Sequence, residues 1–396
     1  MMKLLHLLNR NENLFDDDLA SFDDYLSDLV SQSRFLVLGG AGTIGQSVTK
    51  ELFKRRPQVL HVVDISENNL VELVRDIRSS YGYIGGEFKT FSLDIGSLEF
   101  ESFMAYQSGY DYVLNLSALK HVRSEKDPFT LMRMVETNIF NTQKSLFQAI
   151  NKSAKKYFSV STDKAANPVN MMGASKRIME LFLMQESRRL PVSMARFANV
   201  AFSDGSLMHS FDMRILKEQP LVAPTDVLRY FVTPEESGQL CLLSCLLGNN
   251  LEIFFPKLND ALHLQSFSNL ASRYLKLRGF EPYLCESEEQ ARQLSKTLPK
   301  KGKWPCLFSS SDTSGEKPQE EFYTEQEIID WHRFSNVGVI KQSPVYDEEQ
   351  LRIFSEGISD LRHSGKWTSQ DIVYLFESLL PEFQHLNLGK SLEEKM

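Results

Sequence analysis

A glycine-rich turn between an apolar run and a helix-like segment is the feature that most constrains the fold of this 396-residue chain. The run Arg34-Phe-Leu-Val-Leu38 has the composition of a buried parallel strand, and it leads directly into Gly39-Gly-Ala-Gly42-Thr-Ile-Gly45. Glycines at this spacing permit a tight turn, a close approach of the backbone to a pyrophosphate, and close packing of a helix on a strand. The helix-like segment 43–56 would direct its N-terminal N–H groups at the phosphates. The pattern therefore predicts a dinucleotide-binding unit.

Short apolar runs alternate with helix-like stretches through the first half of the chain. After the first run they lie at 59–63, 88–93, 112–116, 157–160 and 192–197. This alternation predicts an α/β fold with a Rossmann-like, doubly wound parallel sheet. The rhythm breaks near residue 200, which indicates a smaller, mostly helical C-terminal substrate domain.

Acidic residues at two strand ends bear on the cofactor. Asp64 ends the second run, 25 residues after Gly39. A carboxylate there accepts hydrogen bonds from an adenosine ribose and repels a 2′-phosphate, so the sequence predicts NAD rather than NADP. Asp94 and Ile95 end the next run and would suit the adenine edge, although an aspartate there is as often a plain turn residue.

The domain boundaries follow from these patterns. Residues 1–33 are acidic, with apolar residues at helix-like spacing, and we expect a surface helix there. The predicted parts are an acidic helical N-terminal extension (1–33), an NAD-binding Rossmann domain (34–200), a substrate domain interleaved with the core (201–335) and a C-terminal helical extension (336–396).

Polar side chains follow the apolar run that ends at residue 160. Thr162, Asp163 and Lys164 supply a hydroxyl, an acid and an amine, and Lys176 follows in a helix-like stretch. Ligands collect at the carboxyl ends of strands in an open α/β sheet, so these groups would face a substrate. Taken alone, Lys164 could point to solvent and Asp163 could cap a helix. Together with the glycine loop they favour a catalytic site.

The chain resembles the extended short-chain dehydrogenase/reductase superfamily, and within it the UDP-N-acetylglucosamine 4,6-dehydratases of bacterial polysaccharide and legionaminic acid biosynthesis. Besides the glycine loop, the matching motifs are Val63-Asp-Ile-Ser-Glu-Asn-Asn69, Ala118-Leu-Lys-His-Val122, Glu136-Thr-Asn138, Ser161-Thr-Asp-Lys-Ala-Ala-Asn-Pro168, Met172-Gly-Ala-Ser-Lys176, Arg196-Phe-Ala-Asn-Val200, Arg229-Tyr-Phe231 and, less strongly, Thr313-Ser-Gly-Glu-Lys317. The motif 161–168 is specific to this branch, whereas the glycine loop is not.

The resemblance implies an NAD-dependent dehydration of UDP-N-acetylglucosamine to a UDP-2-acetamido-2,6-dideoxy-4-hexulose. C4 is oxidised, Lys164 removes the C5 proton, Asp163 protonates the departing C6 hydroxyl, and the hydride returns to C6. Thr162 would hydrogen-bond the sugar O4, and Lys176 would hold the nicotinamide ribose. A lysine acts as such a base only if its pKa is pulled well below its ordinary value of about 10.4.

The resemblance also implies two sets of binding residues. The cofactor set is Gly39, Gly42, Thr43, Ile44, Gly45, Asp64, Asp94, Ile95, Ser117, Ala118 and Lys176. The substrate set is Lys120, Asn138, Asn199 and Arg229. An arginine suits a bidentate phosphate contact, although Arg229 could instead pair with Asp226 or Glu235.

One position departs from the superfamily's Tyr-x-x-x-Lys pair, because Met172 stands where the tyrosine belongs. A thioether transfers no proton, so Asp163, Lys176 and an ordered water are all candidates for the base at the C4 hydroxyl. The same methionine variant occurs in an active branch that resembles enzymes retaining the C5 configuration. The alternatives are a C5-inverting dehydratase, a nucleotide-sugar 4-epimerase, and a catalytically dead protein that binds NAD or a nucleotide sugar.

Composition narrows the partners. A net charge of −8 without a basic field argues against nucleic acid. Apolar runs such as 240–247 are far shorter than the roughly 20 residues that span a bilayer, so we expect no membrane insertion and a cytoplasmic protein. Cys241 and Cys245 lie one helical turn apart in an apolar run, which is typical of core thiols rather than of a metal site. A homodimer or higher homo-oligomer is expected from the resemblance alone.

Overall fold

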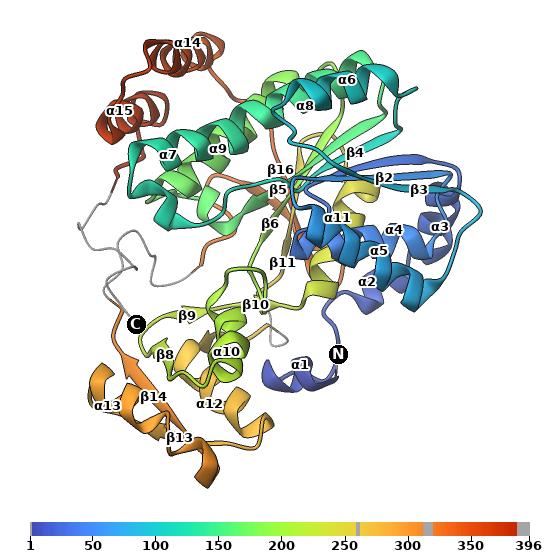
Figure 1. The fold of residues 1–396 in the computed structure, drawn as a ribbon. Coiled ribbons are helices and arrows are strands. Elements are labelled where there is room, and N and C mark those ends of the chain that lie inside the picture. Colours follow the sequence, from blue (N-terminus) through green and yellow to red (C-terminus); the bar gives the residue numbers. More distant parts are fainter. Residues whose placement is uncertain (1, 259–261, 312–319, 386–396) are drawn as a thin grey trace.

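The centre of the protein is a nine-stranded sheet between two layers of helices (Figure 1). The computed structural model describes residues 2–258, 262–311 and 320–385. In spatial order the strands are β15 (Ile328–Asp330), β16 (Val337–Lys341), β11 (Glu252–Pro256), β6 (Val192–Phe197), β5 (Lys156–Thr162), β4 (Tyr112–Asn115), β1 (Arg34–Leu38), β2 (Val59–Asp64) and β3 (Glu87–Ser92). The strands from β11 to β3 run parallel, whereas β16 pairs antiparallel with β11 and β15 pairs antiparallel with β16. The predicted α/β class with a doubly wound parallel sheet is confirmed.

The strand order places the expected ligand crevice at β1. This strand lies between β2 and β4, so the order reverses there, and open α/β sheets bind ligands at the carboxyl ends beside such a point. Helices on one side of the sheet are α4 (Thr43–Lys54), α5 (Glu67–Tyr81) and α11 (Pro234–Leu247) (Figure 1). Those on the other side are α6 (Leu98–Tyr106), α7 (Pro128–Val135), α8 (Asn141–Asn151) and α9 (Met171–Glu186).

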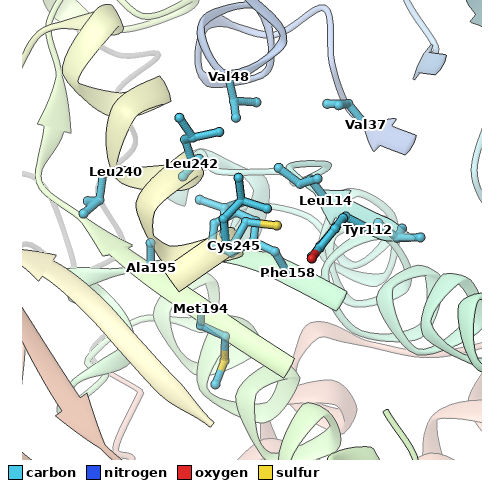
Figure 2. Close-up of a cluster of buried hydrophobic side chains, with 14 of the residues drawn as sticks. Val37, Val48, Tyr112, Leu114, Phe158, Met194, Ala195, Leu240, Leu242 and Cys245 are labelled. Carbon is cyan, nitrogen blue, oxygen red and sulfur yellow. The ribbon is translucent and has the colours of Figure 1, made fainter. Parts of the chain in front are cut away.

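Apolar side chains of the central strands and of the helices α4 and α11 form the main core. Figure 2 shows Leu242 and Cys245 of α11 near Val48 of α4 and Phe158 of β5, and all four are buried. Cys245 is a free thiol, and burial raises its pKa to about 12. It is a packing residue, as its place in an apolar run predicts.

A smaller unit follows β6 and contains strands that the sequence did not predict. Its three-stranded parallel sheet has the order β13 (Glu281–Leu284), β14 (Lys303–Ser309), β8 (Leu221–Pro224). Its helices are α10 (Leu207–Leu216), α12 (Phe267–Leu277) and α13 (Glu288–Leu294). Two short ladders join this unit to the core: β7 (Asn199–Val200) with β10 (Phe231–Val232), and β9 (Leu228–Arg229) with β12 (Gln265–Ser266). The predicted smaller unit is present and its helices contain more residues than its strands, but the sequence analysis missed its sheet.

The N-terminal segment is not the single surface helix that its spacing suggested. It forms α1 (Met2–Leu7), α2 (Asp16–Ala20) and α3 (Asp23–Ser31). Phe15, Leu26 and Val30 are fully buried in the main core. Arg10 makes a two-pronged, buried ion pair with Glu236 of α11, at 2.6 and 2.8 Å. The segment is therefore part of the folded unit, because its apolar side chains are buried in the main core.

The C-terminal segment begins inside the central sheet. The predicted helical part from residue 336 starts with β16, which pairs with β11, and only then come α14 (Glu348–Ser364) and α15 (Ser369–Leu379). These two helices bury Phe354, Ile372 and Phe376 against α7 and α9 in a second apolar cluster. Within the described ranges, no helix has the length and hydropathy needed to cross a bilayer.

Candidate active site

A cavity of about 770 Å³ lies at the carboxyl edge of the sheet and reaches the smaller unit. The glycine loop and the ends of β4, β5 and β6 form its inner wall. Residues 203–208, β8 and Ser309 to Ser311 form its outer wall. The predicted site residues that line it are Gly39, Gly42, Thr43, Ile44, Gly45, Ala118, Lys120, Thr162, Asp163, Lys164, Met172, Lys176 and Asn199.

The glycines of the loop have the separate uses that their spacing suggests. Gly39 has a φ of +70°, and a Cβ there would lie 2.6 Å from the Ser117 nitrogen. A Cβ on Gly45 would lie 2.2 Å from the Gly39 carbonyl oxygen, whereas one on Gly42 would meet nothing closer than 3.7 Å. Gly42 precedes α4, and no side chain caps this helix, so its N-terminus is open to a ligand.

The predicted adenosine contacts lie beside the cavity lining rather than in it. Asp64 accepts hydrogen bonds from the Ala41 and Ser66 nitrogens, both at 2.9 Å, and so holds the glycine loop. Asp94 is exposed and accepts from the Gly96 nitrogen at 2.8 Å, as a turn residue does. Ile95 is buried, and the Ser117 nitrogen donates to a side-chain oxygen of Asn115. Cofactor roles for these residues stay predictions.

Thr162, Asp163 and Lys164 come together where β5 ends. Asp163 and Lys164 lie in the short 3-10 turn η3 (Asp163–Ala165), which orients both side chains into the cavity. The Thr162 hydroxyl donates to Asp163 Oδ1 at 2.7 Å. Lys164 Nζ lies 3.2 Å from both carboxylate oxygens of Asp163, which is only 4% exposed. The three residues form one hydrogen-bonded acid–base group.

The pKa of Lys164 differs from the expectation for a base. Burial disfavours its ammonium form, but the negative charges of Asp163 and Glu320 outweigh burial, and the pKa of Lys164 is raised. The expected lowering is therefore wrong, because these two carboxyl groups favour the ammonium form more strongly than burial and the nearby Arg229 disfavour it.

Lys176 has the lowered pKa that Lys164 lacks. Burial brings its pKa down to about 8, although Glu180 opposes the change. Its Nζ donates to the Val160 carbonyl oxygen at 3.0 Å. Glu180 is itself tied to the fully buried Arg196 at 2.9 Å, so its charge is already compensated.

Met172 lines the cavity, and its surroundings contain a carboxylate that the sequence analysis missed. The Met172 backbone nitrogen donates to Glu125 Oε1 at 3.1 Å. Glu125 Oε2 lies 3.0 Å from His385 Nε2, which follows α15. The C-terminal segment is thereby linked to the start of the helix that carries Met172 and Lys176.

Among the predicted substrate residues, Asn138 has a different place. It is fully buried, bonds the Leu119 backbone in both directions at 2.8 and 3.0 Å, and donates to Ser175 at 2.9 Å. Asn138 therefore holds the loop that carries Lys120; it is not among the residues that line the cavity, and its substrate role stays a prediction. Burial lowers the pKa of Lys120, with Asp204 opposing.

Arg229 and Asn199 lie near a second unpredicted carboxyl group. Arg229 is 5% exposed, donates to the Leu228 carbonyl oxygen at 2.8 Å, and lies behind the cavity lining. The Asn199 amide donates to Glu320, which is buried. Glu320 had no sequence signal of its own; the nearby motif 313–317 lies outside the described residues.

The parallel sheet, the glycine loop and the cavity at its carboxyl edge define a Rossmann-type nucleotide-binding fold. The chain belongs to the polysaccharide biosynthesis protein family, which it matches over residues 35–342. Residues before 35 and after 342, including the α14–α15 pair, lie outside that match.

Three relatives illustrate the similarity. An uncharacterized membrane protein of Methanocaldococcus jannaschii is 32% identical over 59% of this chain and 69% of that protein. The capsular polysaccharide biosynthesis protein CapD of Staphylococcus aureus is 27% identical over 68% of this chain, but the match spans only 45% of CapD. A UDP-N-acetylglucosamine 4,6-dehydratase (inverting) of Campylobacter jejuni is 26% identical over 64% of this chain and 76% of that enzyme.

Solved structures show the same fold. Pen from Bacillus thuringiensis superposes with a TM-score of 0.63 at 22% identity, over 82% of this chain and 98% of its own. DesIV from Streptomyces venezuelae, a dTDP-glucose 4,6-dehydratase solved with NAD, gives 0.55 at 18% identity, over 73% and 87%. The relatives with a named reaction are nucleotide-sugar-modifying enzymes, and family and fold support that class for this chain.

Proposed function

We propose that the protein catalyses the NAD-dependent 4,6-dehydration of UDP-N-acetylglucosamine, with retention at C5, for a surface polysaccharide or nonulosonic acid. The observation that carries the proposal is the hydrogen-bonded group of Thr162, Asp163 and Lys164 inside the cavity that the glycine loop borders. An acid and a base in contact suit the removal of a proton and a hydroxyl group from neighbouring carbons. A 4-epimerase has no use for such a pair.

The glycine loop fits a dinucleotide. The open approach at Gly42 and the uncapped N-terminus of α4 suit a pyrophosphate, and Asp64 suits an adenosine ribose. When bound, NAD would accept the hydride from C4 and return it to C6. Lys176, which lines the cavity, would hold the nicotinamide ribose.

The protonation of the acid–base pair has to change before elimination. Removal of the C5 proton needs a neutral Lys164, and departure of the C6 hydroxyl needs a protonated Asp163. Transfer of one proton across their 3.2 Å contact produces both forms without a change in net charge. Elimination then restores the ion pair, and Lys164 returns its proton to C5 as the hydride arrives at C6. The proton lost from the C4 hydroxyl balances the one that leaves in water.

Met172 separates this chain from tyrosine-bearing relatives. Its side chain can only pack and exclude water, so the C4 proton passes to another group, for which Lys176 and Asp163 are the candidates within the cavity. Retention at C5 rests on resemblance to the methionine-bearing branch.

Mass spectrometry of the product tests the proposal. We expect purified protein to convert UDP-N-acetylglucosamine into a product lighter by one water, without added reductant. A product of unchanged mass but altered configuration would indicate an epimerase, and an L-arabino 4-keto product would indicate inversion. Binding of NAD and the sugar nucleotide without turnover would identify a dead relative.

A further inference from the structure

Glu320 is a buried carboxyl group next to the Asp163–Lys164 pair. It is 6% exposed, and its two oxygens accept hydrogen bonds from Asn199 Nδ2 at 2.5 Å and from the Tyr230 nitrogen at 2.7 Å. Asn199 belongs to β7 and lines the cavity, while Tyr230 joins β9 to β10. Glu320 therefore connects strand β7 with the residue between β9 and β10 through two hydrogen bonds.

The ionisable groups that interact with this carboxyl group are Asp163 and Lys164 of η3, Arg229 of β9, and the phenol of Tyr230 between β9 and β10. Burial and then the repulsion of Asp163 raise the pKa of Glu320 to about 8, while Lys164 and Arg229 oppose the rise. In return, Glu320 helps to hold the proton on Lys164.

We propose that Glu320 is a positioning residue of this site, which holds Asn199 and the Tyr230 backbone in place and whose charge sets how readily Lys164 loses its proton. The inference rests on the proposed function, in which Lys164 is a base. A protonated Glu320 adds no charge, so Lys164 deprotonates more easily. An ionised Glu320 stabilises the ammonium form and keeps Lys164 from acting as a base.

Glu320→Gln isolates the effect of charge. With the Asn199 amide turned, glutamine can keep both hydrogen bonds, but it cannot ionise. We expect a KM for UDP-N-acetylglucosamine within about twofold of wild type. The rate of C5 deuterium exchange into the 4-keto product, which needs a neutral Lys164 but no acid at C6, should rise at lower pH than in wild type, because the charge that stabilises the ammonium form is gone.

Glu321→Gln is the matched control, since Glu321 is exposed and is not among the residues that line the cavity; its carboxylate accepts from Asn167. We expect this variant to keep the wild-type profile. A Glu320→Gln profile that superimposes on wild type would overturn the role of the charge. Glu320→Leu removes both hydrogen bonds and should raise KM roughly 2- to 10-fold; an unchanged KM would overturn the positioning role.

A measurement without substrate separates this inference from the proposed function. A carboxyl group whose folded pKa lies above its unfolded value stabilises the fold at low pH and loses this contribution as pH rises through the folded value, here about 8. The Tm of Glu320→Gln minus that of wild type should therefore increase between about pH 5 and 9. A constant difference would refute the shifted titration, whether or not the enzyme dehydrates UDP-N-acetylglucosamine.

If Glu320→Gln does not fold, infrared spectroscopy of the wild-type protein decides the matter. A protonated carboxyl band that disappears near pH 8 supports the inference. Loss of all such bands below about pH 6, where ordinary carboxyl groups have ionised, contradicts it.

Discussion

Asp163→Asn should separate the two halves of the proposed acid–base pair. Asparagine keeps the size of the side chain and can still accept the Thr162 hydrogen bond, but it removes a negative charge 3.2 Å from Lys164 Nζ. Two unit charges at that distance interact by about 5 kcal/mol at an effective dielectric constant of about 20. The Lys164 side chain is 27% exposed, so solvent screening makes the effect smaller than this figure, but the loss of the carboxylate should still lower the pKa of Lys164.

Deuterium exchange at C5 of the 4-keto product measures Lys164 by itself, since exchange needs a base but no acid at C6. In deuterated water, Asp163→Asn should lose dehydration by about 10²–10⁴-fold. It should keep C5 exchange, and the rise of exchange with pH should occur at lower pH than in wild type, because the neutral lysine forms earlier.

Lys164→Met is the control and should lose both dehydration and exchange. If Asp163→Asn loses exchange as completely as Lys164→Met, Asp163 rather than Lys164 is the C5 base. If its exchange follows the wild-type pH dependence, the carboxylate of Asp163 does not hold the proton on Lys164, and the electrostatic reasoning is refuted.

Three other predictions concern the cofactor, the nucleotide and the core. Asp64→Ala should relax the preference for NAD over NADP, measured by titration of both cofactors; an unchanged ratio would remove Asp64 from the ribose site. Arg229→Ala should raise the KM for the UDP-sugar about 10- to 150-fold with NAD binding unaltered, since a charged hydrogen bond contributes roughly 1.5–3 kcal/mol; an unaltered KM would return Arg229 to a structural role. Glu180→Gln should lower the free energy of unfolding by about 3–5 kcal/mol, because it leaves a buried Arg196 short of its partner. Burial opposes the ionised form of Glu180, but the charge of Arg196 outweighs burial and lowers the pKa of Glu180 to about 2. The stability that the ion pair gives the wild-type protein should therefore be lost only as pH falls from about 4.5 toward 2, measured by urea unfolding. A loss centred near pH 4.5 would contradict the pairing.

The sequence alone determined the parallel strands and the glycine loop. Each predicted strand lies within about two residues of its observed position. For the strands inside the sheet the reason is that a strand buried on both faces needs a continuous apolar run and a turn residue at its end. The placement of Thr162, Asp163 and Lys164 followed in the same way, since the carboxyl end of a parallel strand is a defined place in this fold. These patterns are local, since each lies within a short segment of the sequence.

Contacts between distant parts of the chain decided the rest. Glu320 reaches Asn199 across 121 residues, and Arg10 reaches Glu236 across 226. No local sequence pattern predicts either pairing, because an acidic residue in a polar segment has the same kind of sequence neighbours whether its side chain is exposed or buried. The pKa of Lys164 depends on which carboxyl groups the fold brings beside it. The Asn138 side chain bonds the Leu119 backbone because the folded chain places that loop next to it. Electrostatics in a buried site is a property of three-dimensional distances, so only the tertiary structure could set it.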